Sequence, residues 1–197
     1  MNQEPRIAEL TRETRETKVR AKVNLDGSGE SNVSTGIGFL DHMLTALSRH
    51  GGFDLELTCL GDLGVDCHHT AEDCAMVLGR AVSTALGDRL GIRRFGSAFV
   101  PMDEALARVA IDLSGRPWPV VNLDLRREML GSIATENIVH VFNTLAIELG
   151  ASIHVDVLRG KNDHHKAEAA FKALALSLRQ AFARTEDLRA PSTKGVL

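Results

Sequence analysis

The sequence carries the pattern His-His-x-Ala-Glu twice, at residues 68–72 and again at residues 164–168. On a helix, residues three and four apart share a face, so both histidines of a pair can approach the glutamate. The adjacent histidines themselves point about 100° apart. Neutral imidazole nitrogens and carboxylate oxygens together suit a divalent cation of the manganese, iron, cobalt or zinc group. The two motifs are therefore candidate metal sites.

Each motif is preceded by one further histidine at a similar distance. His42 lies 26 residues before His68, and His140 lies 24 residues before His164. A single His-His pair is more often the start of a helix than a set of ligands, but the repetition in register favours metal binding. The candidate ligands are His42, His68, His69, Glu72, His140, His164, His165 and Glu168. They suffice for two metal ions with positions left for water or substrate.

Strands and helices that would position these ligands can be predicted from periodicity. Apolar and polar side chains alternate with a period of two, as in strands with one buried face, over residues 18–25, 53–59, 109–113, 121–125 and 153–157. Apolar stripes predict helices over residues 39–49, 69–86 and 165–184. Burial on one face favours antiparallel or mixed sheets that are covered by helices.

The order of these elements repeats. In each half, a helix carrying the upstream histidine is followed by a glycine, an alternating strand and the His-His helix. The expected fold class is α/β (α+β), with two pseudo-symmetric halves, each a mixed or antiparallel sheet covered by two helices. We expect one domain over residues 1–197, made of two internal repeats at about 12–98 and 99–190.

Composition limits the possible partners. The chain has 197 residues, of which 44% are hydrophobic and 25% charged, as in ordinary globular proteins. Its net charge of -3, without a long Lys/Arg run, argues against nucleic acid and membrane surfaces. No apolar run suggests a membrane span, and the polar N-terminus is unlike a signal peptide, so we expect a cytoplasmic protein. Cys59, Cys67 and Cys74 fit no disulfide framework, and Cys59 and Cys74 are expected to be buried.

Longer stretches carry a resemblance to a known family. They are "FLDHMLTALSRHGGFDL", "DCHHTAEDCAMVLG", "FGSAFVPMDEALARVAIDLSGRP", "NDHHKAEAAFKALALSLRQAF" and the C-terminal "PSTKGVL". From about Arg12 to Leu197 the chain resembles imidazoleglycerol-phosphate dehydratase. The resemblance implies a fold related to the ribosomal S5 domain 2-like group, two Mn²⁺ ions per active site and a homo-oligomer, commonly of 24 subunits, with active sites at subunit interfaces.

The implied reaction is dehydration of D-erythro-imidazoleglycerol phosphate to imidazole-acetol phosphate in histidine biosynthesis. No carbonyl acidifies the hydrogen that must be removed, so simple base catalysis would fail. If both ring nitrogens bind metals, the imidazolate can expel the neighbouring hydroxyl, and this explains a two-sided site. The resemblance assigns Glu16 as a candidate base. It assigns the substrate phosphate to Arg94, Arg116, Lys172, Ser192 and Lys194.

Two other classes of function remain open from the sequence. A two-metal phosphoester hydrolase would also need metals and basic residues, although the chain has no aspartate-rich hydrolase motif. A non-enzymatic metal-binding assembly protein would need only the ligands and the symmetry, and would leave the basic residues and "PSTKG" without a purpose.

Overall fold

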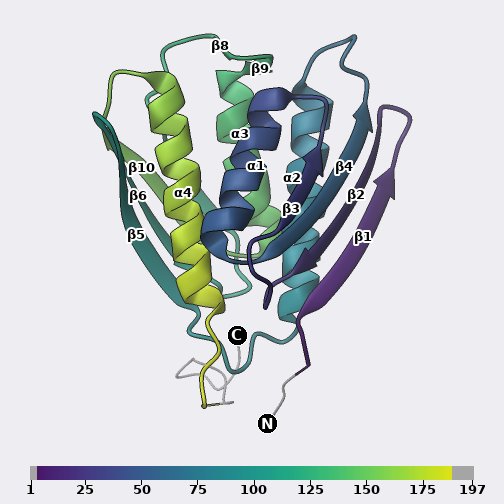
Figure 1. Ribbon diagram of the computed structural model, residues 1–197, viewed down its shortest axis with the longest axis vertical. Coiled ribbons are helices and arrows are strands. Elements are labelled where there is room, and N and C mark those ends of the chain that lie inside the picture. Colours follow the sequence, from purple (N-terminus) through teal and green to yellow (C-terminus); the bar gives the residue numbers. More distant parts are fainter. Residues whose placement is uncertain (1–3, 188–197) are drawn as a thin grey trace.

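The computed structural model describes residues 4–187, in which two four-stranded sheets enclose four helices (Figure 1). The first sheet has the order β1-β2-β4-β3, formed by Ile7–Glu13, Thr17–Asn24, Asp54–Gly61 and Ser31–Ser34. The second has the order β5-β6-β10-β7, formed by Phe95–Met102, Ala105–Asp112, Ser152–Arg159 and Trp118–Asn122. In each sheet only the last pair, β4 with β3 and β10 with β7, is parallel. The matching topology confirms the expected fold class.

The helices form the inside of the molecule. They are α1 (Gly38–Gly51), α2 (His68–Leu86), α3 (Thr135–Leu149) and α4 (Asp163–Phe182). Helix α2 packs on β1 and β2 of its own sheet and on α3 of the other half, whereas α4 packs on β5 and β6 and on α1 (Figure 1). A helix of each half therefore contacts a helix of the other half. A short hairpin, β8 (Met129–Leu130) with β9 (Ile133–Ala134), precedes α3.

Alternation along the strands explains how the sheets bury one face. In β2 the side chains of Thr17, Val19, Ala21 and Val23 are buried, while those between them are exposed or half-buried. Burial of apolar surface contributes about 25 cal/mol per Å², and this favours the observed orientation over a register shifted by one residue. The predicted strand over 121–125 ends earlier, because β7 stops at Asn122.

Small residues allow the closest contacts between layers. A Cβ atom on Gly96 of β5 would lie 2.0 Å from the carbonyl oxygen of Ser177 in α4. A Cβ atom on Gly79 of α2 would lie 2.8 Å from the Cβ of Glu148 in α3. Both glycines therefore set how near α4 and α3 approach their neighbours. All three cysteines are buried and free, as predicted for Cys59 and Cys74. No helix among residues 4–187 has the length and apolar character needed to span a membrane.

Candidate metal centre

The first group of candidate ligands, called the α2–α3 cluster, consists of His68, Glu72 and His140. Their ligand atoms all lie within 4.8 Å of one another. The Nε2 atom of His140 is 2.9 Å from Oε1 of Glu72, and the rings of His68 and His140 have centroids 5.0 Å apart. Helix α2 supplies two of the three because residues four apart share one face.

The second group, called the α1–α4 cluster, consists of His42, His164 and Glu168. The Nε2 atoms of His42 and His164 lie 3.2 and 3.0 Å from the same oxygen, Oε2 of Glu168. The other oxygen, Oε1, is 2.7 Å from Nζ of Lys172. Burial would raise the pKa of Glu168, but the contacts with Lys172 and both histidines outweigh it and lower that pKa to about 2.

Each cluster combines residues from both halves of the chain. The upstream histidine of one half joins the His-x-x-x-Glu helix of the other, because α1 packs on α4 and α2 packs on α3. This exchange could not be read from the motifs, since the spacing within each half would equally allow a cluster made by that half alone.

The second histidine of each pair points elsewhere. The Nδ1 atom of His69 lies 2.9 Å from Oδ2 of Asp62, and Nδ1 of His165 lies 2.7 Å from Oε2 of Glu104. These carboxylates raise the pKa of both imidazoles. Among residues 4–187, neither histidine joins a cluster of candidate ligands. The roughly 100° between adjacent helical residues makes this separation unavoidable.

Glu16 lies in the turn between β1 and β2, with Oε2 3.9 Å from Nδ1 of His69. Buried Asp73 of α2 holds this hairpin: it accepts hydrogen bonds from the hydroxyl of Thr17 and, at 2.7 Å, from Arg12. The predicted base is thus close to one predicted ligand. Asp73 had no signal in the sequence beyond its place next to Glu72.

Two of the predicted phosphate-binding residues, Arg94 and Arg116, are not gathered at the clusters. The amide nitrogen of Arg94 donates to the carbonyl of Ala181, near the end of α4, and helical rise places that end about 25 Å from His164. The Arg94 guanidinium pairs with Asp112, at 2.6 and 3.0 Å.

Arg116 is likewise remote from the α2–α3 cluster, because its carbonyl accepts from Ser152, just beyond the end of α3. Of the three that the structure describes, Lys172 alone adjoins a cluster, through its ion pair with Glu168. Ser192 and Lys194 lie outside the described residues.

Two pockets help to locate the site. One opens beside the α2–α3 cluster and is lined in part by Asp66, His68, Glu136 and Asn137.

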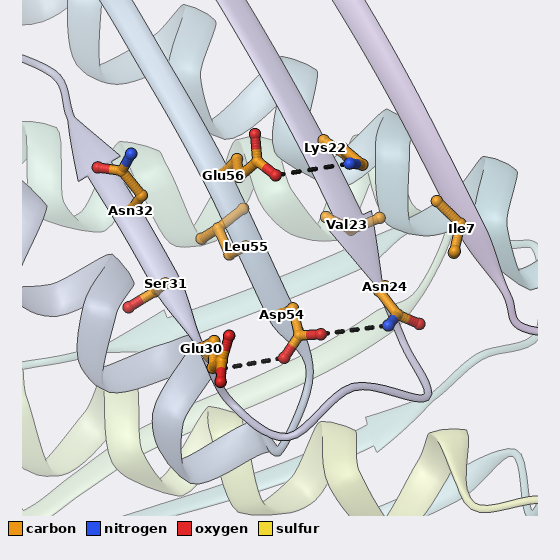
Figure 2. A pocket seen from close by; sticks show the side chains of 10 residues that line it. All are labelled: Ile7, Lys22, Val23, Asn24, Glu30, Ser31, Asn32, Asp54, Leu55 and Glu56. Carbon is orange, nitrogen blue, oxygen red and sulfur yellow. Dashed lines mark hydrogen bonds and ion pairs between the residues drawn. The ribbon is translucent and has the colours of Figure 1, made fainter.

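The other pocket lies on the first sheet and contains no candidate ligand (Figure 2). Four of its polar side chains form pairs, Lys22 with Glu56 at 3.5 Å and Asn24 with Asp54 at 3.1 Å. The pocket beside the α2–α3 cluster is therefore the one associated with the candidate chemistry.

The donor sets fit a divalent cation of the first transition row. Each cluster offers two imidazoles and one carboxylate, and no thiolate. Three protein donors leave coordination positions open, as catalytic rather than structural sites do. The sequence profile of the family described as imidazoleglycerol-phosphate dehydratase matches residues 35–178, which include both clusters. The chain belongs to the imidazoleglycerol-phosphate dehydratase family.

Relatives of similar length support this assignment. The imidazoleglycerol-phosphate dehydratase of Methanothermobacter thermautotrophicus is 55% identical over 95% of this chain and 95% of its own length. The enzyme of Zymomonas mobilis is 54% identical over 98% of this chain and 99% of its own length. A longer protein of the same name from Phytophthora nicotianae is 56% identical over 98% of this chain, which corresponds to 42% of that protein.

Solved structures of family members have the same fold. The dehydratase of Staphylococcus aureus superposes with a TM-score of 0.83, at 35% identity over 91% of this chain and 99% of that one. The Pyrococcus furiosus enzyme superposes with a TM-score of 0.80, at 37% identity over 95% of this chain and 100% of that one. The chain is thus a dehydratase of histidine biosynthesis that acts on a small molecule, and its family is metal-dependent.

Proposed function

We propose that this enzyme converts D-erythro-imidazoleglycerol phosphate to imidazole-acetol phosphate with two Mn²⁺ ions. The observation that carries the proposal is the pair of three-donor clusters, one on each pair of packed helices. A substrate ring with two nitrogens on opposite edges would suit two such clusters. When bound, the metals would act as Lewis acids on the ring nitrogens and as a template for the substrate.

The full sites would form between subunits. His69 and His165 each have Nδ1 held by a carboxylate, and this arrangement leaves Nε2 as the ring nitrogen for a metal, which in His165 lies 3.6 Å from Oδ2 of the exposed Asp103. Because neither joins a cluster in the described part of its own chain, we propose that each completes a site of a neighbouring subunit in a homo-oligomer of 24.

Exposed aromatic residues on the second sheet support association of subunits. Phe95, Phe99 and Trp118 are 57%, 61% and 68% exposed. Large apolar side chains grouped on one face commonly mark an interface.

Glu16 is the proposed general base. Its carboxylate lies next to His69, so a substrate held by a metal on that histidine would present its carbon chain near Glu16. Arg94 and Arg116 would contact the substrate phosphate of a neighbouring subunit, since in their own chain Arg94 lies far from the α1–α4 cluster and Arg116 lies far from the α2–α3 cluster. Lys172, Ser192 and Lys194 complete the proposed phosphate contacts. A cytoplasmic location remains a prediction from the sequence.

Turnover of imidazoleglycerol phosphate by metal-stripped protein, before and after Mn²⁺ is restored, tests the proposal. Keto product that disappears with the metal and returns with it supports a metal-dependent dehydratase. Release of inorganic phosphate instead would indicate a hydrolase, and bound metal without any product would indicate a metal-binding protein.

The role of Glu16 has its own test. Glu16→Gln removes the proposed base and should lower kcat by about 10²-fold or more while Mn²⁺ binding persists. Glu13→Gln is a matched control in the same hairpin, where the exposed Glu13 pairs with Lys18. Equal kcat values for the two variants would exclude Glu16 as the base.

A further inference from the structure

The two clusters have the same ligand types but different neighbours. Three residues before His140 stands Asn137, which is 5% exposed. Its Oδ1 atom lies 2.8 Å from Nδ1 of His68, and its Nδ2 atom donates to Sγ of Cys67 at 3.2 Å. Asn137 therefore connects a metal ligand of α2 to the helix that carries the other histidine of the α2–α3 cluster.

This contact determines the tautomer of His68. A carbonyl oxygen only accepts hydrogen bonds, so Nδ1 of His68 must carry the proton. The bond from Nδ2 of Asn137 to the Cys67 sulfur is consistent with that orientation of the amide, because a thiol sulfur can accept. The Nε2 atom of His68 then keeps its lone pair for a metal, and the ring is already oriented before any metal binds.

The corresponding position of the other cluster has no hydrogen-bonding group. Three residues before His42 stands Phe39, whose ring packs edge-on against His164 with centroids 5.1 Å apart and an interplanar angle of 82°. Within residues 4–187, Nδ1 of His164 has no hydrogen-bond partner. The tautomer and orientation of His164 are therefore less restricted than those of His68.

The carboxylate ligands differ as well. Four residues after Glu168 stands Lys172, whose ammonium is 2.7 Å from Glu168. Four residues after Glu72 stands Met76 instead. In the part of the chain that the structure describes, the only ion pair of Glu72 is with His140. A cation bound at the α1–α4 cluster would therefore lie near the ammonium that pairs with its carboxylate ligand, whereas among residues 4–187 no Lys or Arg pairs with Glu72.

We propose that the two metal sites are unequal, and that the α2–α3 cluster binds a divalent cation more tightly and fills first. The inference rests on the proposed two-metal function and adds an order of loading to it. His69 and His165 do not cancel this difference in affinity between the two sites. A carboxylate holds Nδ1 of each, so both histidines are supported in the same way. Partners of ligating histidines typically change metal affinity by about 10- to 100-fold, which sets the expected gap between the sites.

Titration of the metal-free, full-length protein with Mn²⁺ tests this order. Free Mn²⁺ is followed by its electron paramagnetic resonance signal, and the heat of binding by calorimetry. Wild-type protein should bind Mn²⁺ in two classes that hold the same number of ions. The dissociation constants of the two classes should differ by about tenfold or more. Asn137→Leu should weaken the tight class by about 10- to 100-fold and leave the weak class unchanged.

Two further variants keep the test independent of the folding of Asn137→Leu. Asn137→Asp retains an acceptor for Nδ1 of His68 and should preserve the tight class. Lys172→Met, which introduces the residue found at position 76, should tighten the weak class. Asn32→Leu and Lys22→Met are matched controls on the first sheet, remote from both clusters, and should alter neither class.

The outcomes separate this inference from the proposed function. A single class of two equivalent Mn²⁺ ions in the wild type would overturn the inference alone. The inference would also be overturned if Asn137→Leu weakened the weaker class, or if Lys172→Met left both classes unchanged. A wild-type protein that binds no Mn²⁺ would overturn the two-metal function, and the inference with it.

Discussion

Lys166 shows how one residue of a repeated motif can serve structure instead of chemistry. It occupies the variable position of the second His-His-x-Ala-Glu copy, where the first copy has Thr70. Its side chain is 1% exposed, and Nζ lies 2.5 Å from the carbonyl oxygen of Asp124 and 3.1 Å from Oδ1 of Asp163. The buried ammonium thus attaches the segment before α3 to the start of α4.

Replacing this lysine should destabilise the fold. Lys166→Met leaves buried Asp163 without its ammonium partner, and breaking a buried pair costs about 3–5 kcal/mol. We expect a loss of about 3 kcal/mol in the free energy of unfolding, measured by urea denaturation. Lys161→Met, at an exposed position just before α4, is the control and should change stability by less than about 0.5 kcal/mol. Similar losses for the two variants would contradict the structural role of Lys166.

The sequence marks the candidate ligands more clearly than the residues that support them. A histidine pair and a glutamate in register are recognisable because metal chemistry restricts the residue type and the helix restricts the spacing. Asn137 and Glu104 support ligands that are 69 and 61 positions away, respectively. Nothing local distinguishes them from solvated side chains, so only the packing of remote elements reveals them.

The strands and helices, too, can be predicted where they have a local pattern and not where they depend on remote contacts. The alternating strands β2, β4, β6 and β10 were found, because each buries one face against helices. Strand β5 was not found, since Phe95 and Phe99 are apolar on its exposed face and hide the alternation. The edge strand β1 has three charged residues among its seven, and β3 has only four residues. The pairing of α1 with α4 depends on contacts between halves and had no local signal.

The hairpin of β1 and β2 allows a test of how Glu16 is positioned. Thr17→Val removes the hydroxyl that binds buried Asp73 and keeps the shape of the side chain. The turn carrying Glu16 should then move more freely, and small misplacement of a catalytic group can cost up to about 10²-fold in rate. We expect kcat to fall by about tenfold while Mn²⁺ binding is retained. Thr11→Val, at an exposed site on β1, should leave kcat unchanged, and an equal fall in both variants would refute the argument.

At the scale of the whole molecule, the two outer sheet faces have different chemistry although their topology is the same. The first sheet carries charged pairs, including Arg20 with Glu9 and with Glu56, and exposes the aliphatic side chains of Ile7 and Leu60. The second carries the Arg108–Asp156 pair but also exposes three aromatic side chains, Phe95, Phe99 and Trp118. A duplicated fold would keep its sheets for structural reasons, whereas their outer faces are free to diverge. The proposed subunit contacts therefore belong on the second sheet.

Both ends of the described chain meet at one end of the molecule (Figure 1), where Asp26 joins them. Its carboxylate binds Arg6 at 2.6 Å and Arg184 at 2.8 Å. Partial burial opposes ionisation of Asp26, but the hydrogen bonds from both arginines outweigh it and hold its pKa well below the usual range. The folded state therefore favours the ionised carboxylate, and this contribution to stability is present above the unfolded pKa of about 4 and lost as the pH falls towards the folded pKa.

Asp26→Asn should consequently lower the free energy of unfolding by about 1 kcal/mol at pH 7, a modest value because solvent screens the arginines. The difference from wild type should shrink as the pH is lowered from about 4 to about 2, since the wild-type carboxylate then begins to take up the proton that the variant never needs. Urea denaturation across this range measures it, with Glu13→Gln as the exposed ion-pair control. A difference that stayed constant, or grew, with falling pH would mean that Asp26 joins the two ends of the chain through hydrogen-bond geometry and not through its charge.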